Sequence, residues 1–251
     1  MTLTEHVSAL DNSHGLKEVQ INLKGIQSRA VRADSSPNLP RTNRIGERRS
    51  AIVDALRRCI REKGYAPTSL ADLATAAGMS PSHLLYYFSG KEAVFEQYAR
   101  TLADEILGEV LARVADPPEQ QIDALADYFF GTLLERRIDQ GGVLELFGQA
   151  VHRPTLRRIK ADFDRRMKAH LTVLFRQTPG RGGLGAEDAA ELAFALLVGF
   201  YATTFFDTRL EVARARALFR ADVRRLAGLP QSNRERPRRK PAAPPALRRK
   251  R

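Results

Sequence analysis

From Arg44 to Gly228 the sequence repeats apolar residues at the spacing of an α-helix, and this periodicity restricts the fold more than any other feature. Apolar side chains recur at positions i, i+3, i+4 and i+7, which places them on one face of a helix. Proline and glycine interrupt the pattern, for example at Gly64, Gly78 and Pro154. No convincing strand pattern is present. The periodicity therefore predicts an all-α fold.

The interruptions divide the pattern into about nine expected helices. These span residues 44–63, 70–77, 81–87, 90–114, 118–137, 140–151, 154–177, 186–206 and 208–228. Residues 1–43 contain a brief apolar alternation that no partner strand follows, and four prolines after residue 236 exclude a further helix. We therefore expect two disordered ends, an N-terminal extension (1–43) and a tail (230–251).

Positive charge is unevenly distributed along the 251 residues, which carry 41 Lys or Arg against 29 Asp or Glu and a formal net charge of +12. Residues 44–91 hold eight basic and four acidic side chains, and residues 230–251 hold nine and one. Residues 92–229 hold 19 and 20. Solubility alone can explain a basic tail, although such a tail also attracts nucleic acid regardless of sequence. The basic segment within the helical region needs a separate explanation.

The compartment follows from what the sequence lacks. A single cysteine, Cys59, excludes an intramolecular disulfide and a cysteine-based zinc site. Residues 1–10 have neither the basic start nor the apolar stretch of a signal peptide. The most apolar run, Leu192 to Phe206, has about 15 residues, whereas a membrane-spanning helix needs roughly 18 to 20. We expect a cytoplasmic protein without a membrane span.

Two short helices, 70–77 and 81–87, carry clear start and stop signals. Ser69 and Asp72 have the spacing of a capping box, with aspartate as a shorter form of the usual glutamate. Gly78 can adopt the left-handed conformation that ends a helix. Ser80 and Pro81 then favour a new helix start, because serine caps well and proline is tolerated at the first position.

The spacing of Ala74, Gly78 and Leu84 is that of a helix-turn-helix, with a small residue where the helices touch, glycine four positions later and an aliphatic residue six beyond. Alanine and glycine alone would more simply indicate an ordinary helical corner, but the caps and the apolar register favour the motif. The second helix is expected to expose groups suited to base edges and phosphates in a major groove, namely Pro81, Ser82, His83, Tyr86 and Tyr87.

Basic residues flank this motif. Ser89 and Glu92 fit a second capping box, whose helix start would direct backbone N–H groups and the Lys91 ammonium toward a phosphate. Arg41, Arg44, Arg48 and Arg49 lie at or before the start of the first helix, where cations oppose the helix dipole, so phosphate contact would explain them. The alternative is a flexible, solvated arm.

These residues resemble the N-terminal signature of the TetR family of bacterial transcriptional regulators, through Thr68 to Ala74, Ala77 to Ser80, Leu84 to Phe88, and Lys91 to Ala93. The resemblance is detailed over residues 44–98. It implies backbone contacts by Thr68, Ser69, Tyr86, Tyr87 and Lys91, and base contacts by Pro81, Ser82 and His83. Leu85 departs from the family pattern, in which a phosphate-binding tyrosine is common, so either Tyr86 or Tyr87 takes that role.

The resemblance also implies a division into a helix-turn-helix DNA-binding domain (44–91) and a helical domain for ligand binding and dimerisation (92–229). The expected helix at 186–206 is apolar on more than one face, which indicates a central position or cover by a partner. TetR-like proteins pair their last two helices across a two-fold axis. We therefore expect a homodimer. The residues assigned to its interface are Leu196, Leu197, Phe200, Tyr201 and Phe219.

An effector pocket is a further implication of the resemblance. The candidates on the middle helices are Phe129, Phe130, Phe147, His152, Phe163 and His170. Aromatic residues at helical spacing are also what any packed core needs, and each of these is more simply a core residue. Few polar candidates accompany them, which favours a mainly apolar effector.

Enzyme motifs are missing. The five histidines are scattered, and no nucleophile, base or metal-ligand spacing is present, so we expect no catalytic residue, no metal and no cofactor. The sequence therefore predicts a homodimeric regulator that binds a palindromic double-stranded DNA operator and is released by a small molecule. Two alternatives are a non-switching DNA-organising protein that relies on its basic tail, and an all-helical enzyme.

Overall fold

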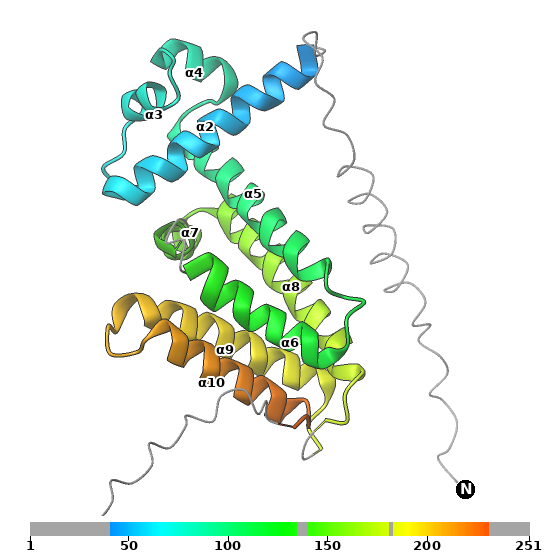
Figure 1. Cartoon of the computed structure of the whole chain (residues 1–251). Coiled ribbons are helices and arrows are strands. Elements are labelled where there is room, and N and C mark those ends of the chain that lie inside the picture. The colour runs from blue at the N-terminus through cyan, green and yellow to red at the C-terminus, as the bar shows by residue number, and fades with distance from the viewer. Residues whose placement is uncertain (1–40, 135–139, 181–182, 231–251) are drawn as a thin grey trace, which may run out of the picture. The chain divides into compact units, whose positions relative to one another are not determined.

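The computed structural model describes residues 41–134, 140–180 and 183–230. Within these ranges the chain forms nine α-helices and one short π-helix, and contains no strand (Figure 1). The all-α prediction is confirmed. The two ends expected to be disordered lie almost wholly outside the described residues. Residues 41–43, which were assigned to the N-terminal extension, already belong to the first described helix.

The first three helices are α2 (Arg41–Lys63), α3 (Leu70–Ala76) and α4 (Pro81–Tyr87). The predicted capping box sets the start of α3, because Asp72 N donates to Ser69 Oγ at 3.1 Å while Ser69 N donates to Asp72 Oδ2 at 2.7 Å. Lys63 Nζ lies 2.7 Å from the same carboxylate. The Lys63 ammonium and the Ser69 donors hold the pKa of Asp72 well below its usual range.

The turn between α3 and α4 also follows the sequence signals. Gly78 has a φ of +67°, which is the left-handed region that favours glycine. Met79 N then donates to Ala74 O at 2.9 Å, which closes the end of α3. Ser80 Oγ accepts from His83 N at 3.2 Å and caps α4. Leu84 is fully buried and anchors α4 in the core.

The second predicted capping box is wrong. Helix α5 (Lys91–Leu111) begins at Lys91, with Gly90 as the residue before it and no side-chain hydrogen bond at the cap. Because the helix starts one residue later than the box requires, Ser89 lies before the capping position. The start of α5 therefore depends on its tertiary contacts rather than on a side-chain cap.

The remaining helices pack around α8. They are α6 (Pro118–Asp127), the π-helix η1 (Tyr128–Leu133), α7 (Gln140–His152), α8 (Pro154–Arg176), α9 (Ala186–Phe206) and α10 (Val212–Leu226). Helices α5, α7 and α9 contact α8, while α10 contacts α9, α6 and η1. The helix expected at 118–137 changes to π geometry at Tyr128, and the one expected at 208–228 begins at Val212.

A close approach joins α5 to α7. A Cβ atom added to Gly142 would lie 2.0 Å from Tyr98 Oη and 2.9 Å from Tyr98 Cζ. Tyr98 is 1% exposed, so its ring has little room to withdraw. Glycine at position 142 thus lets the hydroxyl end of a buried tyrosine reach the backbone of α7.

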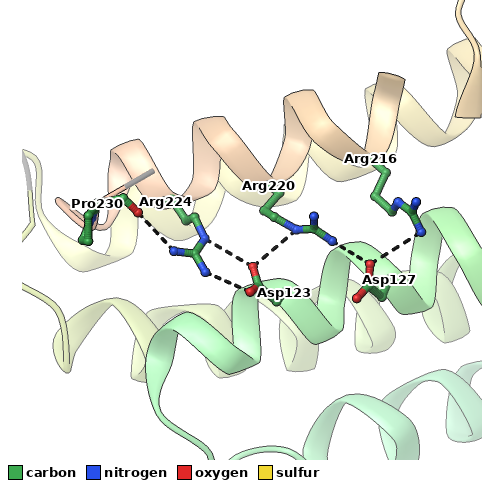
Figure 2. Close-up of polar contacts among 6 residues, drawn as sticks. All are labelled: Asp123, Asp127, Arg216, Arg220, Arg224 and Pro230. Atoms are coloured by element: carbon green, nitrogen blue, oxygen red, sulfur yellow. Dashed lines mark hydrogen bonds and ion pairs between the residues drawn. The ribbon is translucent and has the colours of Figure 1, made fainter. Parts of the chain in front are cut away.

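A row of ion pairs fastens α10 to α6 (Figure 2). Arg224 approaches Asp123 through Nη2 at 2.9 Å, and Arg220 approaches the same carboxylate through Nε at 3.3 Å. Arg220 Nη2 also lies 2.6 Å from Asp127 Oδ1, and Arg216 Nη1 lies 3.6 Å from the same oxygen. Because the Arg224 side chain is only 9% exposed, these charges need one another to compensate for lost hydration.

Helix α9 has a long apolar surface. Its 21 residues are long and apolar enough to cross a membrane by length and composition alone, because the helix starts at Ala186 rather than at Leu192. Core helices pass the same test, and α9 packs against both α8 and α10. One face of α9 lies in the core, while Leu192 and Phe206 are exposed.

Candidate nucleic-acid interface and cavities

Helix α4 presents a mostly exposed outer surface. Pro81, Ser82 and His83 are exposed at its start, and Tyr86 is 73% exposed. The Tyr87 ring is half-buried and lies 5.1 Å from the Tyr86 ring and 5.3 Å from the His83 ring. The predicted base-contact residues therefore share one open surface, and the two tyrosines form an aromatic pair beside it.

Arg49 fixes the end of α4 to α2. Its Nη1 donates to Tyr87 O at 2.6 Å, and its guanidinium lies 4.1 Å from the centre of the Phe88 ring. Phe88 is buried, so this cation–π contact is partly shielded from water. Phosphate contact was the role expected of Arg49, but in this structure its guanidinium contacts the end of α4 and the Phe88 ring. The sequence did not indicate which of the neighbouring Arg48 and Arg49 faces the next helices.

Lys91 is also engaged within the protein. Its Nζ donates to Tyr65 O and to Ala66 O, each at 3.2 Å, and lies 4.4 Å from the centre of the Tyr65 ring. The ammonium was expected to point toward a phosphate, but in this structure it holds the loop between α2 and α3.

Thr68 is a correction to the predicted list. It is 1% exposed, and its Oγ1 donates to Gly64 O at 2.7 Å, so this side chain shapes the loop and is out of reach of DNA. Ser69, by contrast, is exposed while it caps α3. Arg44 and Arg48 are exposed on α2.

Tyr65 joins the α2–α3 loop to the helices that follow. Its ring lies 4.3 Å from the Phe95 ring on α5, and its hydroxyl accepts from Arg153 Nη1 at 3.5 Å. Arg153 precedes α8 and also pairs with Glu96 at 3.2 Å through Nη2. Burial of the phenol is the main reason that its pKa is raised above the usual value. These contacts connect the helix-turn-helix to the corner between α7 and α8.

An apolar cavity of about 60 Å³ lies between α5, η1, α7, α8 and α9. Phe129, Phe147 and Phe163 line it, in agreement with the sequence candidates. Ala99, Leu102 and Ile106 supply the α5 side, and Phe194 and Val198 the α9 side. We refer to this space as the apolar cavity.

The other three pocket candidates lie elsewhere. Phe130 is fully buried in the core, with its ring 5.4 Å from that of Phe219. His152 is exposed at the end of α7. His170 is buried but lines a different cavity. A helical pattern cannot separate these positions, because core and cavity walls have the same periodicity.

Three of the five predicted interface residues are also corrected. Leu197 and Tyr201 are 4% and 5% exposed and line the apolar cavity, and Phe219 is 1% exposed in the core of the same chain. None of these three side chains can contact a second subunit unless the surrounding helices move. Leu196 and Phe200 are half-buried.

A lysine stands at the wall of the apolar cavity. Lys160 Nζ lies 4.6 Å from the centre of the Phe147 ring and 5.7 Å from that of Phe194. Both carboxylate oxygens of Asp164 lie 2.6 Å from the same ammonium. The face of this aromatic wall is thus already occupied by a cation from the protein.

A second, polar cavity of about 380 Å³ lies between α5, α6, η1 and α8. Gln121, Asp127 and His170 are among its lining residues. Burial lowers the pKa of His170 from 6.5 to about 4, so its imidazole is neutral at pH 7. We refer to this space as the polar cavity.

The chemistry expected of a metal centre or reactive thiol is not found in the part of the chain that the structure describes. No group of three or more His, Cys, Asp or Glu side chains there is placed to hold a metal ion. Cys59 is buried in the core, and its burial raises the pKa of the thiol.

Comparison with known proteins gives matches along most of the described chain. Residues 52–98 match the family model described as bacterial regulatory proteins of the tetR family, and residues 118–228 match the model of the C-terminal part of BetI-type transcriptional repressors. The HTH-type transcriptional regulator BetI of Burkholderia mallei (strain NCTC 10229) is 30% identical over 158 residues, which cover 61% of this chain and 80% of that protein.

Solved structures share the fold. A TetR transcription regulator from Haloarcula marismortui superimposes with a TM-score of 0.64 at 18% identity, covering 73% of this chain and 97% of that one. A protein from Saccharomonospora viridis, solved in complex with choline, gives a TM-score of 0.63 at 18% identity, covering 69% and 94%. At these identities the likeness shows the fold alone.

The buried His170 predicts a pH dependence of stability. Between pH 6.5 and 4 the unfolded chain binds a proton at this histidine that the folded chain does not, so the free energy of unfolding falls as the pH is lowered. The two pKa values imply a loss of about 3 kcal/mol from this group across that interval. Urea unfolding at pH 7 and pH 4.5 measures the free energy of unfolding at each pH. The decrease between the two pH values should be smaller for His170→Phe than for the unmodified protein. His152→Phe, at an exposed position, is the control and should show the full decrease, and an equal decrease in all three proteins would contradict the assignment.

Proposed function

The chain belongs to the TetR family of bacterial regulatory proteins, and we propose on that basis that it is a homodimeric repressor that a small, mainly apolar effector releases from a palindromic DNA operator. Its general activity is that of a DNA-binding transcriptional regulator. The dimer, the operator contacts, the effector and a cytoplasmic location belong to the proposal. The observation that carries it is the capped α3–α4 pair, which exposes one side of α4.

The proposed operator contacts start from α4. Leu84 and Phe88 are buried and Arg49 binds the last carbonyl of α4, so the helix is held on two sides. Ser82 and His83 are exposed near its N-terminus, the end that recognition helices direct toward base edges. We propose base contacts for Pro81, Ser82 and His83. Ser69, Tyr86, Tyr87, Arg44 and Arg48 are proposed for the DNA backbone.

The α9–α10 surface supports the proposed dimer. Leu192 is 48% exposed, Phe206 is 74% exposed and Leu218 on α10 is 37% exposed. Gly199 lies between the first two along the same exposed side of α9 and would let a second helix approach closely. We therefore propose that a second copy of the chain covers this surface. Of the residues first assigned to the interface, Leu196 and Phe200 remain at its margin.

The apolar cavity supports an effector without positive charge. The relative from Saccharomonospora viridis was solved with choline, a cation. In this chain the Lys160 ammonium, held by Asp164, already lies against Phe147 and Phe194, so a second cation would have to displace it from these rings. A compact, uncharged apolar molecule fits the lining better.

A route from the cavity to the reading helices is visible in the contacts. The residues of α5 that line the cavity lie on the same helix as Phe95 and Glu96. Phe95 stacks on Tyr65, and Glu96 pairs with Arg153 at the α7–α8 corner. We propose that an effector shifts the population toward a conformation in which these contacts place the two α4 helices at the wrong half-site spacing.

The operator contacts give the first test. Replacing Ser82 and His83 together by alanine should weaken binding to the operator by about 1 to 3 kcal/mol per lost base contact, while binding to random DNA stays the same. Fluorescence anisotropy on both DNAs, at two salt concentrations, measures this difference. His152→Ala, which removes an exposed histidine from α7, is the control. An equal loss on operator and random DNA would contradict sequence-specific contact by α4.

The interface gives the second test. Leu192→Glu combined with Phe206→Glu should convert the dimer to monomer, because burying two carboxylates in an apolar contact costs far more than the contact provides. Light scattering measures the mass. Val151→Glu is matched, since Val151 is 60% exposed on α7, and it should remain dimeric. An unchanged mass of the double variant would place the interface elsewhere.

The effector cavity gives the third test, with toluene and indole as apolar probes and choline as the cationic one. Toluene or indole should raise the Tm and release operator DNA, whereas choline should do neither. Ala103→Phe, which fills the cavity from α5, should bind operator and lose the response to the probes. Release by choline alone would overturn the uncharged effector, and the absence of any response to the probes would overturn the assignment of this cavity.

A further inference from the structure

The polar cavity has features that packing does not explain. It lies on the far side of η1 from the apolar cavity, since Phe129 and Leu133 line the apolar one while Tyr128 and Thr132 line the polar one. Its volume of about 380 Å³ exceeds what a single water molecule needs. The two spaces therefore share the π-helix as a wall but differ in chemistry.

Gln121 supplies a buried acceptor. The residue is 1% exposed, and its Nε2 donates to Asp116 O at 2.7 Å and to Val114 O at 3.2 Å. These two carbonyls fix the amide orientation, because a flipped amide would bring its oxygen against both of them. Gln121 Oε1 is buried and has no hydrogen-bond partner among the described residues. Whatever satisfies this atom must be a donor.

His170 contributes a second buried polar atom from α8. It is 6% exposed, and its Nδ1 is buried without a hydrogen-bond partner in the described part of the chain. Burial keeps the imidazole neutral at pH 7, so it adds no positive charge to the cavity. Leaving two polar groups buried and unpaired is unfavourable, and an occupant that pairs with them removes this cost.

The charged residues around the cavity favour one sign of charge on a bound ligand. Asp127 is already paired with Arg216 and Arg220 (Figure 2), and Arg113 lies 3.7 Å from Asp116. Glu109 also lines the cavity and is exposed. Its carboxylate is therefore one that a ligand can reach without displacing an arginine from Asp127.

We propose that the polar cavity is a second ligand site, which binds a small organic ammonium ion carrying N–H donors. The N–H groups would bond Gln121 Oε1 and His170, and the positive charge would lie near Glu109. A quaternary ammonium ion has the charge but no N–H group, so it leaves Gln121 unsatisfied. The site is independent of the effector that we propose for the apolar cavity.

Ethanolamine and choline provide matched probes, because they share the hydroxyethyl chain and the positive charge and differ in the N–H donors. Isothermal titration of the full chain should give saturable binding of ethanolamine and at least tenfold weaker binding of choline. Glu109→Gln, a change at an exposed position, should weaken ethanolamine binding about threefold or more, and Gln121→Leu or His170→Phe about tenfold. Ala103→Phe, in the apolar cavity, should leave it unchanged.

The outcomes are distinguishable. No saturable heat with ethanolamine would mean that the cavity holds water only, and the proposal would be wrong. Equal binding of choline and ethanolamine, or undiminished binding by the Glu109→Gln variant, would also overturn it. Because Gln121 supports the loop before α6, each variant is first compared with the unmodified protein by circular dichroism. If Gln121→Leu fails to fold, the Glu109→Gln variant and the comparison of ethanolamine with choline still test the proposal.

Discussion

The Tyr65 side chain holds together parts of the chain that are far apart in sequence. Its ring packs on Phe95, its face receives the Lys91 ammonium and its hydroxyl accepts from Arg153. The loop before α3, the start of α5 and the α7–α8 corner therefore meet at one buried residue. If these contacts were lost, α3 and α4 would keep their own caps, and Arg57, which pairs with Glu105 on α5 at 2.7 Å, would remain as a connection to the helices that surround the cavities. The contacts of the proposed regulatory route therefore meet at a residue that is also part of the core.

The local signals in the sequence predicted the helix-turn-helix well. Ser69, Asp72, Gly78 and Ser80 act as expected, because capping and left-handed turns depend on residues a few positions apart. Long-range contacts were not predictable in this way. Lys91 looked like a phosphate ligand because its nearest neighbours in sequence suggested a helix start, yet its partners are carbonyls 25 and 26 positions earlier. Arg49 is a parallel case, because phosphate contact was expected of it too, yet its guanidinium donates to Tyr87 O, 38 positions later.

Helix α9 shows a second limit of sequence reasoning. Its apolar residues surround much of the helix, so the pattern predicted two buried sides without distinguishing them. Leu197 and Tyr201 face the cavity of their own chain, whereas Leu192 and Phe206 remain exposed. The ion pairs of Asp123 and Asp127 with α10 could not be predicted from the sequence either. A helical charge pattern does not indicate which residues about 90 to 100 positions away are the partners. Pairing of this kind is a property of the packed structure.

The π-helix carries a consequence for how this protein tolerates insertions and deletions. A π turn holds about one residue more than an α turn, and one residue corresponds to about 100° of rotation around the helix axis. Removal of one residue between Phe129 and Thr132 would let the segment return to regular α geometry, and the later side chains of the helix would keep nearly the same direction, because the π turn already holds one extra residue. Phe129 and Leu133, which line the apolar cavity, would then be three residues apart instead of four, as would Tyr128 and Thr132, which line the polar one. The segment that separates the two cavities should therefore accept the loss of a residue more readily than a regular α-helix would.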